Sequence, residues 1–426
     1  MSRASEALPN ILLINFHSTM NAGDLGLLLS ARDFLLHAFP YSEITVSANW
    51  PDEPSYKAYG FRVVSSPWSL SGLNRDTSVF QQFTKFVSTC IQLMNTDPDR
   101  NFSEDTDRLR AAYRESDLII SVPGNQFYSS GRYGWPFPVS ISGTLLAHWY
   151  KKPLLVLPQS IGPLKRWWER MLVRKAYGRA TRIFLRDNKS LELAEEIGLP
   201  VEKVSYAPDL ALGLHSVEPE QAQRILRGAG VDMEKPKLGV TLISKMNRSF
   251  DSAAMHNYYD SVEKGLSGFA YEHSVQIVFF NQVSGPTPVE NDSIPTAMMM
   301  KNLREKGVNA FHIEDRLTPS MLKTCYGQMD AFLATRLHSG IFAIGMNVPT
   351  LFIGYLTKTQ GIVKSLKIED DFLDISFLSK EKVKEKLESL WLNRTEIREN
   401  LENTMDRAQQ LIGRSIELLK KDFSND

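Results

Sequence analysis

The sequence predicts an α/β fold: two doubly wound, Rossmann-like domains facing a cleft, followed by a helical C-terminal tail. Apolar runs of five to seven residues alternate with amphipathic segments, which is the pattern of βα units with parallel strands. These runs are continuous rather than alternating, as expected for strands that are covered by helices on both faces. The chain has 426 residues, which is too many for one ordinary core.

The first half of the chain begins with the apolar run NILLINF, residues 10–16, followed by the amphipathic helix 24–39. The strands predicted after it are 43–48, 117–122, 153–158 and 182–187. Further helices are predicted at 142–151 and 188–198. Each strand is thus followed by a helical segment before the next strand, as in a doubly wound sheet.

The second half repeats this pattern after a polar connection that contains one short helix. Its predicted strands are 238–243, 274–280, 309–314, 331–336 and 350–355. We therefore predict four regions, an N-terminal α/β domain, a connection, a C-terminal α/β domain and a helical tail: 1–212, 213–236, 237–378 and 379–426.

Composition restricts the partners of the chain. Lys plus Arg (49) balance Asp plus Glu (49), so no net charge favours nucleic acid, and an anionic ligand needs a local cluster of cations. Cys90 and Cys325 are far apart and are read as buried thiols in a reducing compartment. The N-terminus lacks the apolar core of a signal peptide, and no segment reaches the roughly 20 apolar residues of a membrane span. These features predict a cytoplasmic protein.

Ligands of doubly wound sheets bind outside the carboxyl ends of the strands, so residues just after strands are site candidates. The polar turn 17–26 contains Asp24, which either caps the following helix or faces the cleft. Residues 121–134 contain a predicted turn at Pro123-Gly124-Asn125, whose polar rim suits a sugar. An ordinary Gly-rich loop is the alternative there. Asn125 is the substrate-binding candidate in this loop.

Two further candidates follow strands of the first domain. The stretch PQSIGP, 158–163, has prolines that fix the backbone, and Ser160 and Gly162 are expected to approach a ligand. Arg186 ends a strand and precedes a helix, where a guanidinium is a good receptor for phosphate or carboxylate. An internal salt bridge of the Arg186–Asp187 type is the alternative.

The most unusual stretch is residues 334–355, in which Arg336 and His338 separate two apolar runs. If the strand extends through them, both side chains point to the same face at the mouth of the next helix. Ser339 belongs to the same substrate-binding group, and Lys358 would add a third positive charge. No second histidine or carboxylate lies at ligand spacing, so no metal site is predicted.

Taken in order, these motifs resemble the polysaccharide pyruvyl transferase family. The matching pieces, all between about residues 10 and 365, are NAGDLG, DLIISVPGNQF, PQSIGP, FLRDNKSLELAEEIG, APDLAL and TRLHSGIFAIGMNVPTLFIGYLTKTQG. The resemblance implies a fold similar to GT-B glycosyltransferases. It also implies phosphoenolpyruvate as the donor substrate, no other cofactor, and a pyruvate ketal on a sugar as the product.

The resemblance then suggests roles for the domains and the candidates. The N-terminal domain would be on the acceptor side, and the C-terminal domain on the donor and catalytic side. Arg336 and Arg186 would clamp the anions of the donor, with Lys358 as a weaker third group. His338 would be the general acid/base, since imidazole titrates near neutrality. Asp24 would orient or deprotonate an acceptor hydroxyl.

Several alternatives stay open at this point. One alternative is a GT-B glycosyltransferase that uses a nucleotide sugar, which would need a nucleotide-binding carboxylate such as those of IEDD, 368–371. Another is a catalytically silent binding or assembly component, which would need no such carboxylate. The acceptor glycan is either free or lipid-linked. The basic, aromatic segment 165–175 lies on an anionic membrane surface or is a helix that packs Trp167, Leu172 and Val173 on the sheet. The oligomeric state is open.

Overall fold

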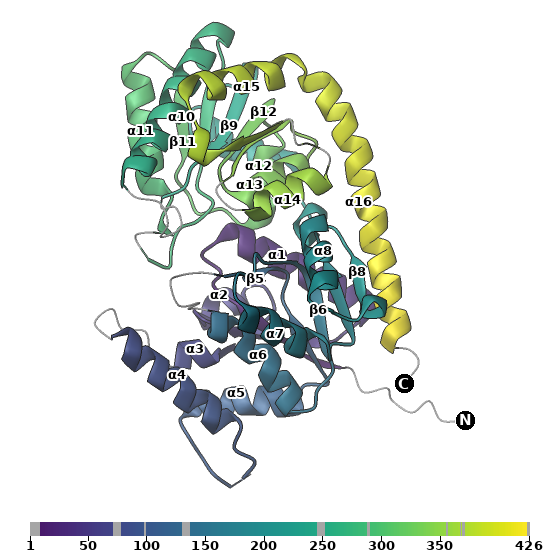
Figure 1. Ribbon diagram of the computed structural model, residues 1–426. Coiled ribbons are helices and arrows are strands. Elements are labelled where there is room, and N and C mark those ends of the chain that lie inside the picture. Colours follow the sequence, from purple (N-terminus) through teal and green to yellow (C-terminus); the bar gives the residue numbers. More distant parts are fainter. Residues whose placement is uncertain are drawn as a thin grey trace. The chain divides into compact units, whose positions relative to one another are not determined.

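The chain forms two compact units (Figure 1). The computed structural model describes residues 9–70, 78–97, 99–129, 137–244, 252–287, 290–354, 357–366, 368 and 371–423, without the side chains of 53, 70, 79, 357 and 358. The first unit takes the chain up to Thr19, Leu27–Leu210 and the chain from Leu411, and the second takes Met20–Gly26 and Ala211–Gln410. The change of unit at 210 lies two residues before the domain end predicted at 212. Unlike the predicted domains, the second unit includes Met20–Gly26, and the tail is divided.

The first unit contains an eight-stranded parallel sheet in the order β3-β2-β1-β4-β6-β7-β8, with β5 paired to β6. Its strands are β1 Asn10–Phe16, β2 Glu43–Ala48, β3 Arg62–Ser65, β4 Leu118–Ser121, β5 Gly124–Phe127, β6 Leu154–Ile161, β7 Arg182–Leu185 and β8 Val204–Tyr206. The middle strands are almost wholly buried, which explains their continuous apolar sequence.

Helices connect these strands, and several begin at capping side chains predicted by helix chemistry. Ser78, Ser103 and Asp187 each accept a hydrogen bond from a backbone N–H of the first turn. The helices are α1 Ala22–Ala38, α2 Glu53–Lys57, α3 Pro67–Leu70, α4 Val79–Leu93, α5 Glu104–Glu115, α6 Phe137–Trp149, α7 Trp167–Tyr177 and α8 Asn188–Glu196, with 3-10 turns at Val201–Lys203 and Leu210–Gly213.

The second unit contains a six-stranded parallel sheet in the order β11-β10-β9-β12-β13-β14. Its strands are β9 Lys237–Thr241, β10 Gln276–Phe280, β11 Ala310–Ile313, β12 Ala331–Ala334, β13 Thr350–Gly354 and β14 Phe372–Asp374. In both sheets the strand order reverses after the first strand, between β1 and β4 and between β9 and β12. This is the Rossmann arrangement, and such a reversal is where doubly wound proteins bind ligands.

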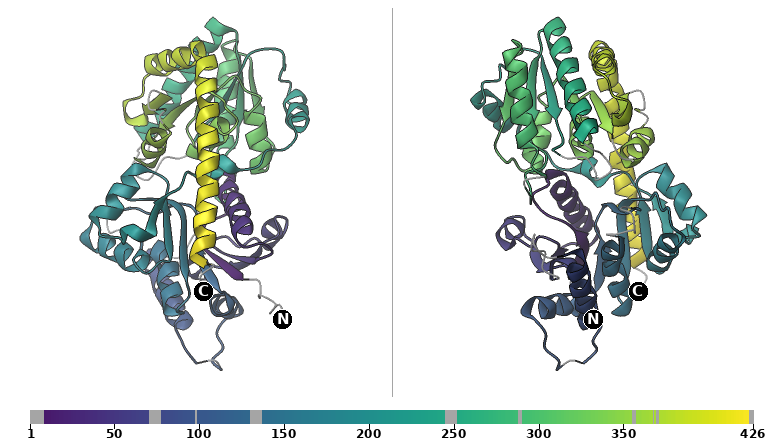
Figure 2. Two further views of the ribbon diagram at one scale, coloured as in Figure 1. Left: turned by 90° about the vertical axis from the view of Figure 1, so that its right-hand side faces the viewer. Right: turned by 60° about the vertical axis from the view of Figure 1, so that its left-hand side comes forward.

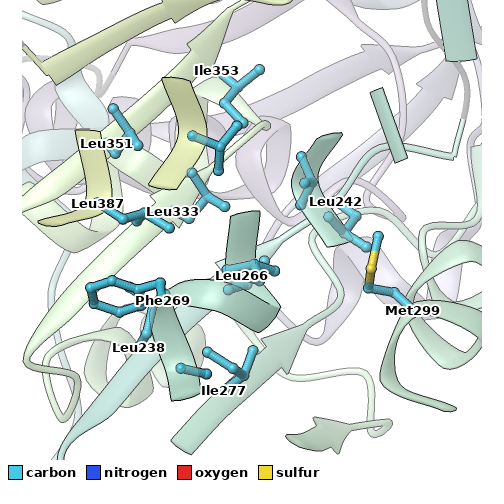
Figure 3. Packing of buried hydrophobic residues seen from close by; sticks show 14 of the residues in the cluster. Leu238, Leu242, Leu266, Phe269, Ile277, Met299, Leu333, Leu351, Ile353 and Leu387 are labelled. Carbon is cyan, nitrogen blue, oxygen red and sulfur yellow. The ribbon is translucent and has the colours of Figure 1, made fainter. Parts of the chain in front are cut away.

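Helices cover both faces of this second sheet (Figure 2). In Figure 3, Leu333 and Leu351 of the strands pack with Leu266 and Phe269 of α10 and with Leu387 of α15. The helices are α9 Pro219–Gly228, α10 Ser252–His273, α11 Ser293–Glu305, α12 Pro319–Tyr326, α13 Leu337–Ile344, α14 Thr357–Ser365, α15 Lys380–Leu392 and α16 Arg394–Phe423, with a 3-10 turn at Ile375–Phe377. Within the described parts of the chain, no helix is both long and apolar enough to cross a membrane.

The predicted class is confirmed: both units are parallel α/β sheets, and the C-terminal tail is helical, ending in the long α16 (yellow in Figure 2). Three local predictions are wrong. Residues 124 and 125 begin strand β5 instead of forming a turn, and β6 continues to Ile161, so that Ser160 lies inside a strand. Strand β12 ends at Ala334, two residues earlier than predicted.

Candidate functional site

The candidate site in the second unit lies at the reversal of strand order, where β12 pairs with β9 through Ala334 and Thr241. Arg336 is the N-cap residue of α13, with φ −95° and ψ 126°, and the helix begins at Leu337. His338 is therefore in the first helical turn, and the strand alternation that was expected to align it with Arg336 does not apply. Both residues nevertheless lie in one strand-to-helix turn at the position where ligands bind.

Arg336 is held by a bidentate ion pair with Asp292. Its Nη2 and Nε donate to the two carboxylate oxygens at 2.6 and 3.1 Å. Asp292 is fully buried and also accepts from the backbone N–H groups of Ser244 and Val283 at 3.0 and 3.1 Å. Burial raises the pKa of Asp292, while the guanidinium and the backbone donors act in the opposite direction. The Arg336 side chain stays 18% exposed, so the ion pair fixes its orientation without covering it.

His338 lies against the glycine of the NAGDLG motif. A Cβ atom built on Gly23 would stand 2.5 Å from Nδ1 and 2.7 Å from Cβ of His338, so only glycine permits this approach. The motif is fixed there by an antiparallel bridge of Asn21 with Val283, and Ala22 donates its N–H to the carbonyl of Gln282 at 2.9 Å. Two motifs more than 300 residues apart are thereby brought into contact within the second unit.

Asp24 lies in the first turn of α1 beside this contact, but it is not the helix cap. The cap is Asn21, whose Oδ1 accepts from the N–H groups of Gly23 and Asp24 at 2.9 and 3.4 Å. The Asp24 carboxylate accepts from Asn21 Nδ2 at 2.9 Å and is half-buried. The capping alternative for Asp24 is therefore wrong, and its carboxylate is oriented by the true cap.

Behind this turn lies a layer of buried polar side chains. Ser339 is fully buried, and its hydroxyl bonds with Thr241 Oγ1 and the Arg336 carbonyl, both at 2.6 Å. Tyr258 donates to Thr335 Oγ1 at 3.0 Å. These contacts place Ser339, a predicted substrate-binding residue, in the support of the turn rather than at its surface.

Sequence reasoning missed the residues contributed by the neighbouring strand end. Asn281 and Gln282 directly follow β10, and the Asn281 side chain bonds with His312 Nε2 at 3.0 Å. Gln282 accepts from Tyr326 at 2.8 Å, and its amide nitrogen is buried with no hydrogen-bond partner among the described residues. Burial lowers the pKa of His312. The run FFNQ, polar residues after an apolar strand, was the available signal.

Lys358 and one surface cluster of possible metal ligands lie outside the turn that carries Arg336 and His338. The side chain of Lys358 lies outside what the structure describes. On the surface, ligand atoms of Glu272, His273 and Glu388 lie within 4.8 Å of one another, and Lys384 ion pairs with both glutamates there. Its ammonium group thus already neutralises these carboxylates.

In the first unit, Arg186 is buried, not presented to a ligand. Its side chain is 1% exposed and ion pairs with Asp209, and its Nε donates to Ser160 Oγ at 3.0 Å. Ser160 in turn donates to Asp187, the cap of α8, at 2.6 Å. These contacts favour the internal salt bridge that the sequence left open for Arg186, and they engage Ser160 in the same network.

A polar cavity of about 60 Å³ lies at the strand-order reversal of the first unit. Its polar lining comes from several strand ends and from α6, and includes Asn15, Ser47, Asn49, Ser66, Gln126 and Ser140. Asn15 adopts a φ of 70° and donates to Ser121 at 3.1 Å. Asn125 and Gln126 each have a buried side-chain oxygen without a hydrogen-bond partner in the described part of the chain. Gly162 has a φ of 87° and does not line this cavity.

The two parallel sheets define an α/β protein of the GT-B-like class, and comparisons with solved structures agree. The complex of Anabaena HepE with UDP-glucose has a TM-score of 0.57 at 10% identity, covering 98% of this chain and 100% of that chain. The UDP co-structure of S. aureus MnaA has a TM-score of 0.58 at 11% identity, covering 92% of this chain and 90% of that chain. At such identities the likeness shows the fold alone.

The family model described as polysaccharide pyruvyl transferase matches residues 21–357, and the chain belongs to this family. The chain is therefore a transferase that acts in polysaccharide modification, as the sequence motifs suggested. A similar protein is the amylovoran biosynthesis protein AmsJ of Erwinia amylovora, which is 20% identical over 312 residues, 73% of each chain.

Proposed function

We propose that this protein transfers the pyruvyl group of phosphoenolpyruvate to a sugar of a glycan and closes a pyruvate ketal there. The observation that carries the proposal is the meeting of Arg336, His338 and the Gly23-Asp24 turn at the strand-order reversal of the second unit. The donor has a phosphate and a carboxylate, and a guanidinium matches both in geometry and charge.

Arg336 is the anion-binding residue in this proposal. Asp292 orients the guanidinium by two hydrogen bonds, and its 18% exposure leaves it accessible to a small dianion. The N-terminus of α13 begins at the next residue, so its backbone dipole also favours negative charge at this point. A charged group that is already oriented stabilises negative charge in the transition state without the cost of rearrangement.

His338 is the general acid. It delivers a proton to the methylene carbon of the donor, so that the enol carbon becomes an oxocarbenium-like centre. One acceptor hydroxyl adds to that carbon and loses its proton, with Asp24 as the base. A second hydroxyl then displaces phosphate by breaking the carbon–oxygen bond, its proton leaves with the phosphate as hydrogen phosphate, and the ketal closes.

Taken by itself, the cavity of the first unit has a lining that suits a sugar. About 60 Å³ is room for several hydroxyl-sized groups, and the cavity offers amide and hydroxyl side chains with Trp68 beside them. The unpartnered oxygen of Gln126 suits a sugar hydroxyl, which can donate to it. Gln126 lies in the predicted sugar-binding loop 121–134, next to Asn125, and residues 130–134 of this loop lie outside what the structure describes.

The test is phosphate release from phosphoenolpyruvate with a panel of acceptor glycosides. We expect acceptor-dependent release, and stabilisation of the protein against heat by phosphoenolpyruvate but not by UDP-glucose. The reverse pattern of stabilisation, with no phosphate release for any acceptor, would refute the proposal in favour of a nucleotide-sugar enzyme.

The role of His338 is tested by His338→Ala, with the exposed His256→Ala on α10 as the matched control. General acid catalysis contributes about 10²- to 10⁴-fold, so kcat should fall by that factor while phosphoenolpyruvate still binds. The control should keep full turnover. Equal turnover in the two variants would remove His338 from the mechanism.

A further inference from the structure

The first unit has an apolar groove between α4, α6 and α7 that the proposed chemistry does not use. Its volume is about 520 Å³, within the range of about 300 to 1,000 Å³ that small-molecule pockets have. The apolar side chains lining it include Phe86, Cys90, Met94, Ile141, Leu145 and Leu172. The helices are drawn in shades of blue in the lower part of Figure 1.

Beside the groove, α4 exposes a second apolar stripe to solvent. Phe80, Phe83, Val87 and Ile91 are 74%, 40%, 36% and 59% exposed. Their spacing of three and four residues places them on one face of the helix, next to the stripe that lines the groove. Lys85 is the only charged residue of α4. A soluble surface rarely leaves so continuous an apolar face uncovered.

The neighbouring helices add aromatic and basic side chains to this face. Trp149 at the end of α6 lines the groove and is 50% exposed. On α7, Trp167 and Met171 are 75% and 51% exposed and lie two turns and one turn, respectively, before Lys175, which lines the groove with Arg179. Of the three residues of this segment that were expected to pack on the sheet, Val173 is buried and Leu172 packs against the core, whereas Trp167 is exposed.

The basic residues around the groove favour an anionic partner. Lys175 and Arg179 are exposed, and neither has an ion pair among the described residues. No carboxylate is found among the described residues that line the groove. Tryptophan with lysine or arginine around an apolar face is the composition of proteins that bind at the headgroup level of a bilayer.

We infer that this surface docks on an anionic lipid bilayer, with the α4 stripe and Trp167 inserted among the lipids, one lipid chain in the groove, and Lys175 and Arg179 on the phosphate groups. A second copy of this chain is a poorer occupant. A two-fold interface over this face would bury Lys175 and Arg179 of both copies, and the described lining of the groove offers no carboxylate to pair with them. The inference does not depend on the proposed reaction.

The test is co-sedimentation of the full chain with vesicles of phosphatidylcholine, with and without phosphatidylglycerol. The wild type should partition at least tenfold better onto the anionic vesicles. The variant Phe83→Ser/Ile91→Ser should lose at least tenfold on them, and Lys175→Glu/Arg179→Glu should lose the preference for anionic lipid. Matched controls on exposed sites of the second unit, Tyr271→Ser and Lys301→Glu, should bind as the wild type does.

Two results would overturn the inference. One is equal partitioning of the wild type and the Phe83→Ser/Ile91→Ser variant. The other is a wild type that is dimeric by light scattering and a Phe83→Ser/Ile91→Ser variant that is monomeric, without any binding to vesicles. That second result would assign the face to an interface between copies of the chain. Neither measurement involves phosphoenolpyruvate or a glycan, so failure here is distinguishable from failure of the proposed reaction.

Discussion

Arg186 in the first unit and Arg336 in the second occupy equivalent places along the chain. Each follows a parallel strand, precedes a helix and ion pairs with an aspartate. Their surroundings differ, because the Arg186 side chain is 1% exposed and the Arg336 side chain is 18% exposed. The same local sequence pattern therefore produces a buried structural ion pair in the first unit and a partly exposed arginine in the second.

The order of the strands explains the difference. Arg186 follows β7, which lies between β6 and β8, away from the reversal of strand order in its sheet. Arg336 follows β12, the neighbour of β9 at the reversal of strand order, which is where doubly wound sheets bind their ligands. An arginine at a strand end is thus a ligand-binding candidate mainly where the strand order reverses.

The largest effect on stability is expected from Arg186→Met. The substitution removes the guanidinium from Asp209, which is 3% exposed, and leaves a buried carboxylate without its counter-charge. Breaking one side of a buried pair costs about 3 to 5 kcal/mol. Urea unfolding should show that the free energy of unfolding falls by this amount. A decrease below about 1 kcal/mol would contradict a structural role for the buried ion pair of Arg186.

Removing both partners of each pair separates structural from functional roles. Replacing a buried pair by apolar residues is often neutral for folding, so Arg186→Met/Asp209→Leu should recover most of the lost stability and keep its activity. Arg336→Met/Asp292→Leu leaves the N–H groups of Ser244 and Val283 without their acceptor, so it should fold with a lower stability. It should also lose about 10²-fold or more in kcat/KM for phosphoenolpyruvate, because charged hydrogen bonds to the donor disappear. Comparable kcat/KM values in the two double variants would erase the distinction between the arginines.

Lys323 is a buried cation of the second unit. Unlike Arg186 and Arg336, it can lose its proton. Its Nζ donates to the carbonyls of Leu212 and Leu214 at 2.9 and 2.7 Å, and burial lowers its pKa from 10.5 to about 8. Between these two pH values the unfolded chain holds a proton that the folded chain has released. The free energy of unfolding therefore rises with pH across this window, by about 2 to 3 kcal/mol.

The control for this titration is Lys323→Met, which has no proton to lose at that position. Subtracting its pH profile of unfolding from that of the wild type removes the contribution of other groups, such as the Cys325 thiol, whose pKa is raised to about 12 by burial. A difference that stays flat from pH 8 to 10.5 would mean that Lys323 keeps its ordinary pKa.

The sequence predicted the scaffold more fully than the contacts of the site. Strands β1 and β2 were predicted to the residue, and the signal for β1 was a continuous apolar run of the kind that strands covered on both faces carry. The partner of Arg336 could not be found this way, since Asp292 lies 44 residues earlier and only folding brings it close. Strand β5, GNQF, was missed because three of its four residues favour turns or solvent.

The cap of α1 shows a finer limit of sequence reasoning. Asn21 and Asp24 are both good capping residues within four positions, and local sequence does not choose between them. The choice follows from the bridge of Asn21 with Val283, which ends the extended segment at residue 21 and starts the helix at Ala22. A long-range contact therefore decides where Asp24 points.

The smallest expected effect comes from Gly23→Ala, which tests whether the contact between the two motifs supports turnover. The added methyl group would stand 2.5 Å from His338 Nδ1, so the ring must shift, and overpacking of this kind costs about 1 to 3 kcal/mol. Gly228→Ala on α9 is the matched control, since a Cβ there has no atom within 4 Å, and it should raise stability by about 0.4 to 1 kcal/mol. If His338 transfers the proton, Gly23→Ala should lower kcat more than it weakens phosphoenolpyruvate binding, since a misplaced acid slows the chemical step while Arg336 still holds the anion. Equal kcat values for the two alanine variants would show that the position of the His338 ring does not limit the reaction.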